Sequence, residues 1–228
     1  MKNRTKIILM TIAGICASAW IIINKTVDVG TAGPKDCKVG LHLINTSFHD
    51  LWSYDSVLKY NELWYKITQY IGYLALGAAG VLAIIGLVQL IKRKNLFKVD
   101  KCILSAGVLY AITIALYAFF EIVVINYRPI IMPDDTEPAA SFPSSHTMLV
   151  IVVFGSIMVL LKNYVKKTLV RMSLYFLCLI VIVTMVLGRF ICGVHWFSDI
   201  IGGMLIGLFL VLAYSIFAKN ETGTIENK

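Results

Sequence analysis

Charged residues are scarce in this sequence, and their scarcity limits the kind of protein it can encode. Only 15% of the 228 residues are Asp, Glu, Lys or Arg, while 58% are apolar. An ordinary soluble domain is about 45–50% apolar. Together with a mean hydropathy of +0.79, this excess indicates that most of the chain has a lipid bilayer rather than water as its solvent.

Acidic residues are the scarcer of the two charged classes. The 13 Asp and Glu residues are outnumbered by 21 Lys and Arg residues, which gives a formal net charge of +8. Such an excess can indicate binding to nucleic acid. Here, however, the basic residues lie in short clusters between apolar runs, which is typical of the cytoplasmic loops of membrane proteins. We therefore expect no nucleic-acid partner.

Proline is rare and interrupts none of the long apolar runs. The five prolines all lie outside six runs that are long enough, or nearly long enough, to cross a hydrocarbon core, which takes about 17–25 helical residues. The runs cover approximately residues 7–24, 68–91, 102–125, 146–161, 172–189 and 199–218. We therefore predict an all-α integral membrane bundle of six transmembrane helices that forms a single domain over residues 1–228.

The region before the second run has two further features. The basic start "MKNRTK" and the apolar stretch after it resemble a signal peptide, with Ala17, Ser18 and Ala19 as the cleavage site. Because "WIII" continues the apolar run past that site, we expect an uncleaved helix. Between the first two runs, the aromatic residues of "LWSYDSVLKYNELWY" (51–65) predict an interfacial amphipathic segment.

The positions of lysine and arginine predict the orientation in the membrane. Fourteen of the 21 lie in the N-terminal segment, in the loops after the second and fourth runs, and in the C-terminal tail. By the positive-inside rule, both termini and these two loops are cytoplasmic. The chain is then a multi-pass protein of the cell membrane, and the loops after the first, third and fifth runs are extracytoplasmic.

Histidine is also rare, and the predicted topology brings two of the four histidines to one face. His146 and His195 lie at the outer starts of the fourth and sixth runs, and Arg128 and Arg189 lie at the outer ends of the third and fifth. Asp199 follows His195 by four residues. Because such side chains are costly next to lipid, the constellation predicts a functional site lined by water or substrate.

These residue types suit phosphoryl transfer. Two arginines can hold a phosphate-like oxyanion, and two histidines can divide the roles of nucleophile and general acid between them. Asp199, one helical turn from His195, can accept a hydrogen bond from one ring nitrogen and leave the other free to attack. A zinc site fits less well, because the spacing is not His-x-x-x-His and no third strong ligand stands nearby.

Three motifs resemble the pattern of the type 2 phosphatidic acid phosphatase family, which includes lipid pyrophosphate phosphatases and is related to vanadium haloperoxidases. That pattern is Lys-x6-Arg-Pro, Pro-Ser-Gly-His and Ser-Arg-x5-His-x3-Asp. The sequence has "EIVVINYRP" (121–129), "PSSH" (143–146) and "GRFICGVHWFSD" (188–199) in the same order. The resemblance implies a membrane lipid phosphatase that needs no metal or organic cofactor.

The resemblance also implies a role for each matching residue. His195 is the nucleophile that forms a phosphohistidine, Asp199 orients it, and His146 protonates the leaving oxygen. Arg128, Arg189, Ser144 and nearby backbone N–H groups hold the phosphoryl oxygens. The substrate is a phosphate monoester or pyrophosphate on a lipid headgroup, and the site faces the extracytoplasmic side.

The sequence departs from the family pattern at three positions. Ser145 replaces a glycine and can still offer its backbone N–H if the turn tolerates a Cβ. Gly188 replaces a serine, which removes one hydroxyl donor. Glu121 replaces a lysine; it lies two helical turns before Arg128, so we expect its carboxylate to face the pocket and to pair with Arg128 or Arg189.

Some alternatives stay open at the level of the sequence. A catalytically silent lipid-headgroup binding protein or transporter could use the same cationic pocket, with Glu121 as a proton-linked switch. Among the five cysteines, Cys37 and Cys192 are both expected on the outer side and could form a disulfide there. The identity of the lipid phosphate and the oligomeric state cannot be predicted.

Overall fold

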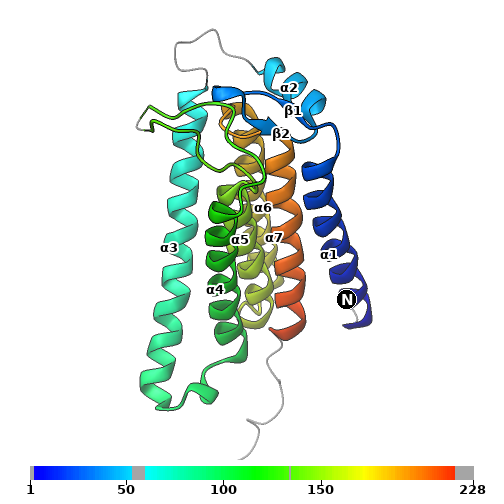
Figure 1. Cartoon of the computed structure of the whole chain (residues 1–228). Helices are drawn as coiled ribbons and strands as arrows, with labels where there is room; N and C mark the ends of the chain where they lie inside the picture. Colours follow the sequence, from blue (N-terminus) through cyan, green and yellow to red (C-terminus); the bar gives the residue numbers. More distant parts are fainter. Residues whose placement is uncertain (1–2, 53–59, 134, 219–228) are drawn as a thin grey trace, which may run out of the picture.

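Six long helices make up the computed structural model, which describes residues 3–52, 60–133 and 135–218 (Figure 1). Each helix is long and apolar enough to cross a membrane. They are α1 (Asn3–Thr26), α3 (Glu62–Arg93), α4 (Lys101–Ile122), α5 (Ser145–Tyr164), α6 (Thr168–Cys192) and α7 (Phe197–Phe217). The predicted all-α bundle with six spans is therefore confirmed, and the chain is a multi-pass membrane protein.

The helix ends differ from the predicted ones by a few residues. α3 begins six residues earlier than expected because the side chain of Asn61 accepts a hydrogen bond from the backbone N–H of Trp64 and caps the helix there. α4 ends at Ile122, whereas the apolar run continues to residue 125. The run of apolar side chains predicted the span correctly, but it could not mark the residue at which the backbone leaves the helix.

Short elements lie at the two ends of the bundle. β1 (Gly30–Thr31) and β2 (Lys38–Val39) form a small antiparallel sheet, with the single 3-10 turn η1 (Pro34–Asp36) between them. The short helix α2 (His42–Leu51) follows and lies across the same end of the bundle (Figure 1). A second 3-10 turn, η2 (Leu96–Lys98), joins α3 to α4 at the other end.

The predicted interfacial segment at 51–65 is described only in part. Its middle, residues 53–59, lies outside the described residues. Trp52 directly follows α2, and Trp64 and Tyr65 belong to the first turn of α3. The described helix between the first two spans is thus α2.

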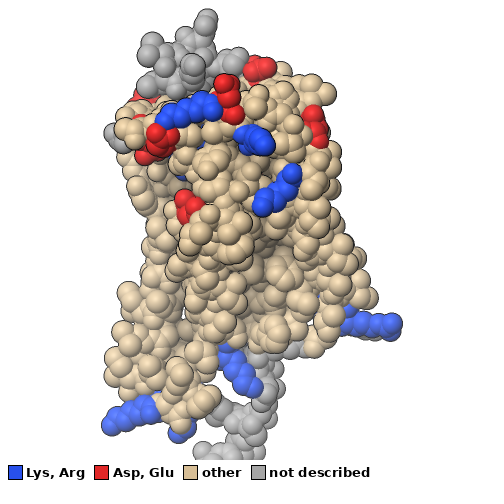
Figure 2. Space-filling model, viewed as in Figure 1, with Lys and Arg blue, Asp and Glu red and all other residues tan. Residues whose placement is uncertain are grey.

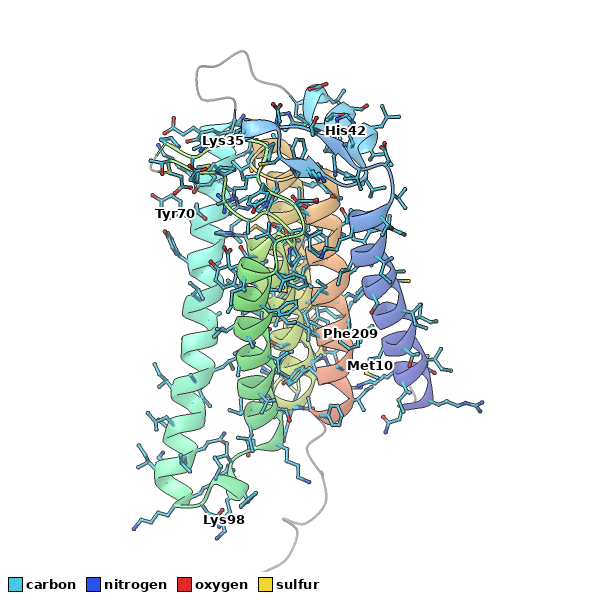
Figure 3. All side chains as sticks on the ribbon, in the orientation of Figure 1. Met10, Lys35, His42, Tyr70, Lys98 and Phe209 are labelled. Carbon is cyan, nitrogen blue, oxygen red and sulfur yellow. The ribbon has the colours of Figure 1, made fainter. Side chains whose placement is uncertain are left out.

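α5 occupies the centre of the bundle and packs against α3, α4, α6 and α7. Its Met148 and Val152 contribute to a core that also contains Ile206 and Leu210 of α7. α1 packs against α7 on the outside of the bundle, where Phe209 and Met10 lie at about the same height (Figure 3). α3 buries few side chains and presents residues such as Tyr70 outward, as expected for a lipid-facing helix.

Charged side chains avoid the middle of the molecule. Figure 2 shows a broad band without charge between an end that carries both signs and an opposite end where the charges visible on this face are basic. Lys35 and His42 lie at the first end and Lys98 at the second (Figure 3). An uncharged band between two polar ends is the pattern that a bilayer requires.

The connection between α6 and α7 is short and sharply turned. Gly193 ends α6 with a φ of +76°, a left-handed conformation that favours glycine, and α7 begins at Phe197. His195 lies within this connection. The turn therefore holds His195 at the end of the bundle at which α5 begins.

Candidate active site

Several of the predicted site residues come together in one pocket, at the end of the bundle where α4 stops and α5 starts. The pocket has a volume of about 110 Å³, less than the roughly 300–1,000 Å³ of a site that encloses a whole drug-sized ligand. Its lining includes Glu121, Arg128, Ser145, His146 and His195. Its size and charge suit a small anionic group.

His195 is almost completely buried, with 6% of its surface exposed. Its ring nitrogen Nε2 has no hydrogen-bond partner among the described residues. Burial, reinforced by the positive charges of Arg128 and Arg189, lowers the pKa of His195 well below the usual 6.5. The ring is therefore neutral at pH 7, and this nitrogen is free to act on a group in the pocket.

The predicted direct hydrogen bond between Asp199 and His195 is not formed. The hydroxyl of Ser141 lies between them, with its oxygen 3.0 Å from Nδ1 of His195 and 2.5 Å from Oδ2 of Asp199. Ser141 belongs to the loop before α5. The backbone of this loop pairs with residues 126–128, and this pairing places the serine at the end of the bundle. Asp199 is completely buried beneath it.

Two arginines contribute positive charge to the site. Arg189 is 1% exposed and donates from Nη2 to the side-chain oxygen of Gln69 on α3, at 3.2 Å. Arg128 is half-buried at the pocket wall, and Nε of each arginine has no partner in the described ranges. Neither forms an ion pair with a carboxylate of the described chain. Because a positive charge that is wholly or partly removed from water is costly without a negative partner, both residues can bind an anion.

The predicted site residue Ser144 faces away from this lining. It is completely buried, and its hydroxyl lies 3.0 Å from the hydroxyl of Thr147 rather than at the pocket wall. Ser145, the first residue of α5, does line the pocket and has no unusual backbone conformation, so the turn tolerates its Cβ. The unpaired backbone N–H groups at the start of α5 lie next to Ser145 and can hold anionic oxygens.

Gly188 has a packing reason to lack a side chain. A Cβ at this position would come within 2.6 Å of Thr68 and 3.0 Å of Trp64, so a larger residue would push α3 away from α6. The close approach of the two helices brings Gln69 and Tyr65 of α3 against Arg189. The departure from the family pattern at Gly188 thus allows another helix to complete the site.

Glu121 lines the pocket at its exposed side, but the predicted pairing with an arginine is not formed. Its carboxylate makes no ion pair with Arg128 or Arg189. Within α4, its hydrogen-bond partner is the hydroxyl of Tyr117, one helical turn earlier. The reason is geometric: Glu121 stands on the outer surface of the last turn of α4, whereas Arg189 is buried on α6.

Sequence reasoning missed Ser141, Asn126 and Gln69, all of which contact a predicted site residue. Asn126 and Gln69 are neutral polar residues within largely apolar stretches, and this feature of the sequence could have marked them as candidate site residues. Ser141 carried no comparable signal.

The two cysteines considered for a disulfide are not joined. Cys37 and Cys192 both have free thiols, and Cys192 is completely buried. No group of three or more His, Cys, Asp or Glu within the described part of the chain could hold a metal ion.

Known proteins resemble this chain in sequence family and in fold. The family model of the PAP2 superfamily matches residues 103–222. No curated protein matches the sequence. A similar solved structure is the crystal structure of the first transmembrane PAP2 type phosphatidylglycerolphosphate phosphatase from Bacillus subtilis, with a TM-score of 0.61 and 18% identity over 93% of this chain and 94% of that chain. At this identity, the likeness concerns the fold. α1, α2 and α3 lie outside the matched residues.

Proposed function

The chain belongs to the PAP2 superfamily, and on this basis we propose that it is a membrane lipid phosphatase. It hydrolyses a phosphate monoester or a pyrophosphate on a lipid headgroup through a phosphohistidine intermediate. The related fold of a PAP2 type phosphatidylglycerolphosphate phosphatase supports a substrate of this kind. Residues 1–228 act as one phosphatase domain.

One observation carries this proposal: Nε2 of His195, which has no partner among the described residues, lies in a pocket wall together with Arg128, which pairs with no carboxylate of the described chain. A neutral imidazole with a free lone pair is a nucleophile. Arginines without carboxylates are ligands for the phosphoryl oxygens. Simple binding of an anion would be better served by a protonated histidine than by one kept neutral by burial.

The first chemical step transfers the phosphoryl group to the protein. Nε2 of His195 attacks phosphorus, and the bond from phosphorus to the lipid oxygen breaks. Protonated His146 gives its proton to that oxygen, and the negative charge of the bound phosphate favours this protonated form of the ring. Arg128, Arg189 and the N–H groups at the start of α5 stabilise the charge on the equatorial oxygens.

The second step releases phosphate. Water attacks the phosphorus of the phosphohistidine, His146 accepts a proton from that water, and the bond from nitrogen to phosphorus breaks. The products are inorganic phosphate and the restored histidine, and His146 again carries a proton for the next cycle. The protein's own residues perform both steps.

An apolar cavity beside the pocket favours a lipid over a soluble phosphate. It has a volume of about 290 Å³ and is lined by side chains of α3, α4 and α5, including Leu76, Ile114 and Leu149. Ser145 and His146 line both this cavity and the charged pocket. A headgroup in the pocket can therefore continue into a tail that contacts apolar residues of the bundle and lies in the bilayer.

The distribution of basic residues supports an extracytoplasmic site. The end of α3, η2 and the start of α4 lie at the end of the bundle opposite to the pocket and carry Lys92, Arg93, Lys94, Lys98 and Lys101. By the positive-inside rule that end is cytoplasmic, together with both chain termini. The substrate headgroup is then presented from the outer leaflet.

The test is phosphate release by the purified protein against phosphatidic acid, phosphatidylglycerol phosphate and undecaprenyl pyrophosphate, in detergent micelles. We expect release from at least one of them, a phosphoenzyme that is stable in alkali and labile in acid, and loss of both in His195→Gln. The matched control is His42→Gln, since His42 is only half-buried and lies outside the pocket. Tight lipid binding without phosphate release would support the silent binding protein or transporter instead.

A further inference from the structure

The hydroxyl of Ser141 lies between two residues of the proposed catalytic site, His195 and Asp199. It is 2% exposed, with its oxygen 3.0 Å from Nδ1 of His195 and 2.5 Å from Oδ2 of Asp199. The backbone N–H of Ser141 donates to the carbonyl of Asn126 at 2.9 Å, which fixes the position of the serine. A buried hydroxyl with one proton and two partners must donate to one and accept from the other.

The surroundings of Asp199 decide the direction of these hydrogen bonds. The backbone N–H of Trp196 can only donate, and it bonds to Oδ2 at 3.1 Å. The side chain of Asn126 donates from Nδ2 to Oδ1 at 2.8 Å. The orientation of that amide follows from Gly40, whose backbone N–H donates to its oxygen at 3.4 Å. Two donors therefore face the carboxylate, as expected for an ionised group that accepts hydrogen bonds only.

Since Asp199 accepts, Ser141 donates to it and must accept from His195. Nδ1 of His195 then carries the ring proton, and Nε2 carries the lone pair. This is the nitrogen that has no hydrogen-bond partner in the described chain and that the proposed mechanism uses for attack. The hydrogen bonds that link Asn126, Asp199, Ser141 and His195 therefore all agree with the tautomer of His195 that carries its proton on Nδ1.

We propose that Ser141 is a positioning residue that connects the carboxylate of Asp199 to His195 and holds the ring in the tautomer with the proton on Nδ1. The inference rests on the proposed role of His195 as nucleophile. When Nε2 becomes bonded to phosphorus, the ring gains positive charge, and the hydrogen bonds through Ser141 to Asp199 stabilise it. Removing the hydroxyl interrupts this stabilisation and leaves the ring with only the backbone of Ser141 as a partner among the described residues.

The experiment compares Ser141→Ala with Ser141→Thr, which keeps a hydroxyl, and with Ser156→Ala as a matched control. Ser156 is also completely buried and hydrogen-bonded, but it contacts Tyr110 in the middle of the bundle. We expect Ser141→Ala to lower kcat by about 10- to 100-fold with KM changed by less than about threefold. Ser141→Thr should recover part of kcat, and Ser156→Ala should keep the wild-type value.

Ring-nitrogen chemical shifts provide a second readout that does not depend on activity. With ¹⁵N-histidine, the wild type should show a single tautomer for His195, protonated on Nδ1, and Ser141→Ala should show a mixture. The four histidines can be assigned with single substitutions. Wild-type kcat together with an unchanged tautomer in a folded Ser141→Ala protein would overturn the proposal.

The two readouts separate this proposal from the proposed function. A wild-type protein that releases no phosphate from any lipid would overturn the phosphatase assignment and, with it, the catalytic role of Ser141. The shifts would then still decide whether the hydrogen bonds run as assigned. An active wild type with the ring proton on Nε2 would overturn the inference on Ser141 while leaving the phosphatase intact.

Discussion

Arg189 of α6 donates a 3.2 Å hydrogen bond to the side-chain oxygen of Gln69 of α3, although 120 residues separate them in the sequence. Gln69 in turn donates to the hydroxyl of Tyr65 at 3.3 Å, and the guanidinium carbon of Arg189 lies 5.7 Å from the centre of the Tyr65 ring. α3 lies outside the residues that the family model matches. A helix that the motifs do not include thus orients one of the two arginines.

Gln69→Leu is expected to weaken phosphate binding more than it slows turnover. The substitution keeps a side chain of similar size but removes the acceptor for Arg189, so the guanidinium loses a hydrogen bond worth about 1 kcal/mol. At about 1.4 kcal/mol for each factor of ten, this corresponds to a rise of about fivefold in the inhibition constant of vanadate. The measurement is vanadate inhibition at several substrate concentrations.

Gln89→Leu is the control for this change, because Gln89 is on the same helix and also donates to a residue outside it, Asp100, which directly precedes α4 far from the pocket. It should leave vanadate inhibition unchanged. Equal inhibition of the wild type and Gln69→Leu would mean that Gln69 does not orient Arg189 for an anion.

Much of the fold could be predicted because a helix needs a minimum number of apolar residues to cross a bilayer, and six runs in the sequence have about this length. The gathering of Arg128, His146 and His195 was predictable for a related reason: they lie at ends of spans that the topology places at one depth. Ser141 was not predictable, because it reaches His195 only through the pairing of loop residues such as Tyr127 and Ala140. Neutral polar residues in a loop have no periodicity and no charge that would mark their partners.

Activity is expected to survive removal of metal ions and to be lost with vanadate. The proposed mechanism uses arginines where many phosphatases use metal ions to stabilise the phosphoryl oxygens. Vanadate adopts the five-coordinate geometry of phosphoryl transfer and should compete with the lipid for the pocket. The measurement is phosphate release after treatment with EDTA and across a vanadate series. Loss of activity in EDTA that a divalent ion restores would point to a metal enzyme instead.

An impermeant thiol reagent is expected to reach the loop before α5 but not the loop after it. Glu137→Cys and Lys166→Cys place single exposed probes at the two ends of the bundle. Cys16→Ser/Cys37→Ser is the background for both, because the Cys16 thiol is exposed on α1 and the Cys37 thiol is partly exposed at the same end as Glu137. In intact cells Glu137→Cys should be labelled, and Lys166→Cys should react only after permeabilisation. The opposite result would place the pocket on the cytoplasmic side.

The protein is expected to lose thermal stability as the pH falls from 7.5 to 5. Burial lowers the pKa of His195 well below 6.5, so the unfolded chain takes up a proton at this residue near pH 6.5 while the folded protein does not. Below that pH the unfolded state binds more protons and is favoured by up to about 1.4 kcal/mol per pH unit. The loss continues until the pH reaches the folded pKa.

His195→Gln should reduce this dependence on pH, and the midpoint of thermal unfolding in detergent measures it. His49 has a pKa that burial lowers in the same direction, so His49→Gln should also reduce the slope, although His49 is less buried and does not line the pocket. If the midpoints of the wild type and His195→Gln fall in parallel between pH 7.5 and 5, His195 is not kept neutral in the folded protein.

The last prediction concerns Glu121, whose exposed carboxylate lines the pocket without an arginine partner. A negative charge at this position repels the phosphate that Arg128 attracts, and it can accept hydrogen bonds from a hydroxyl or amine elsewhere on the headgroup. Glu121→Gln keeps the shape and removes the charge, so it should lower the inhibition constant of vanadate by about threefold, as expected for a partly solvated charge. Glu121→Lys should lower it further.

The same variants should change substrate preference. Phosphatidylglycerol phosphate has a free hydroxyl on its headgroup, and phosphatidic acid does not. In Glu121→Lys the carboxylate that accepts from this hydroxyl is gone, so kcat/KM for phosphatidylglycerol phosphate should fall relative to kcat/KM for phosphatidic acid. Glu137→Gln is the control, since Glu137 is an exposed carboxylate in the loop after α4 that already pairs with Lys35. If Glu121→Gln and Glu121→Lys match the wild type in vanadate inhibition and in substrate preference, Glu121 acts on neither the phosphate nor the headgroup, and its place at the pocket wall has no electrostatic consequence.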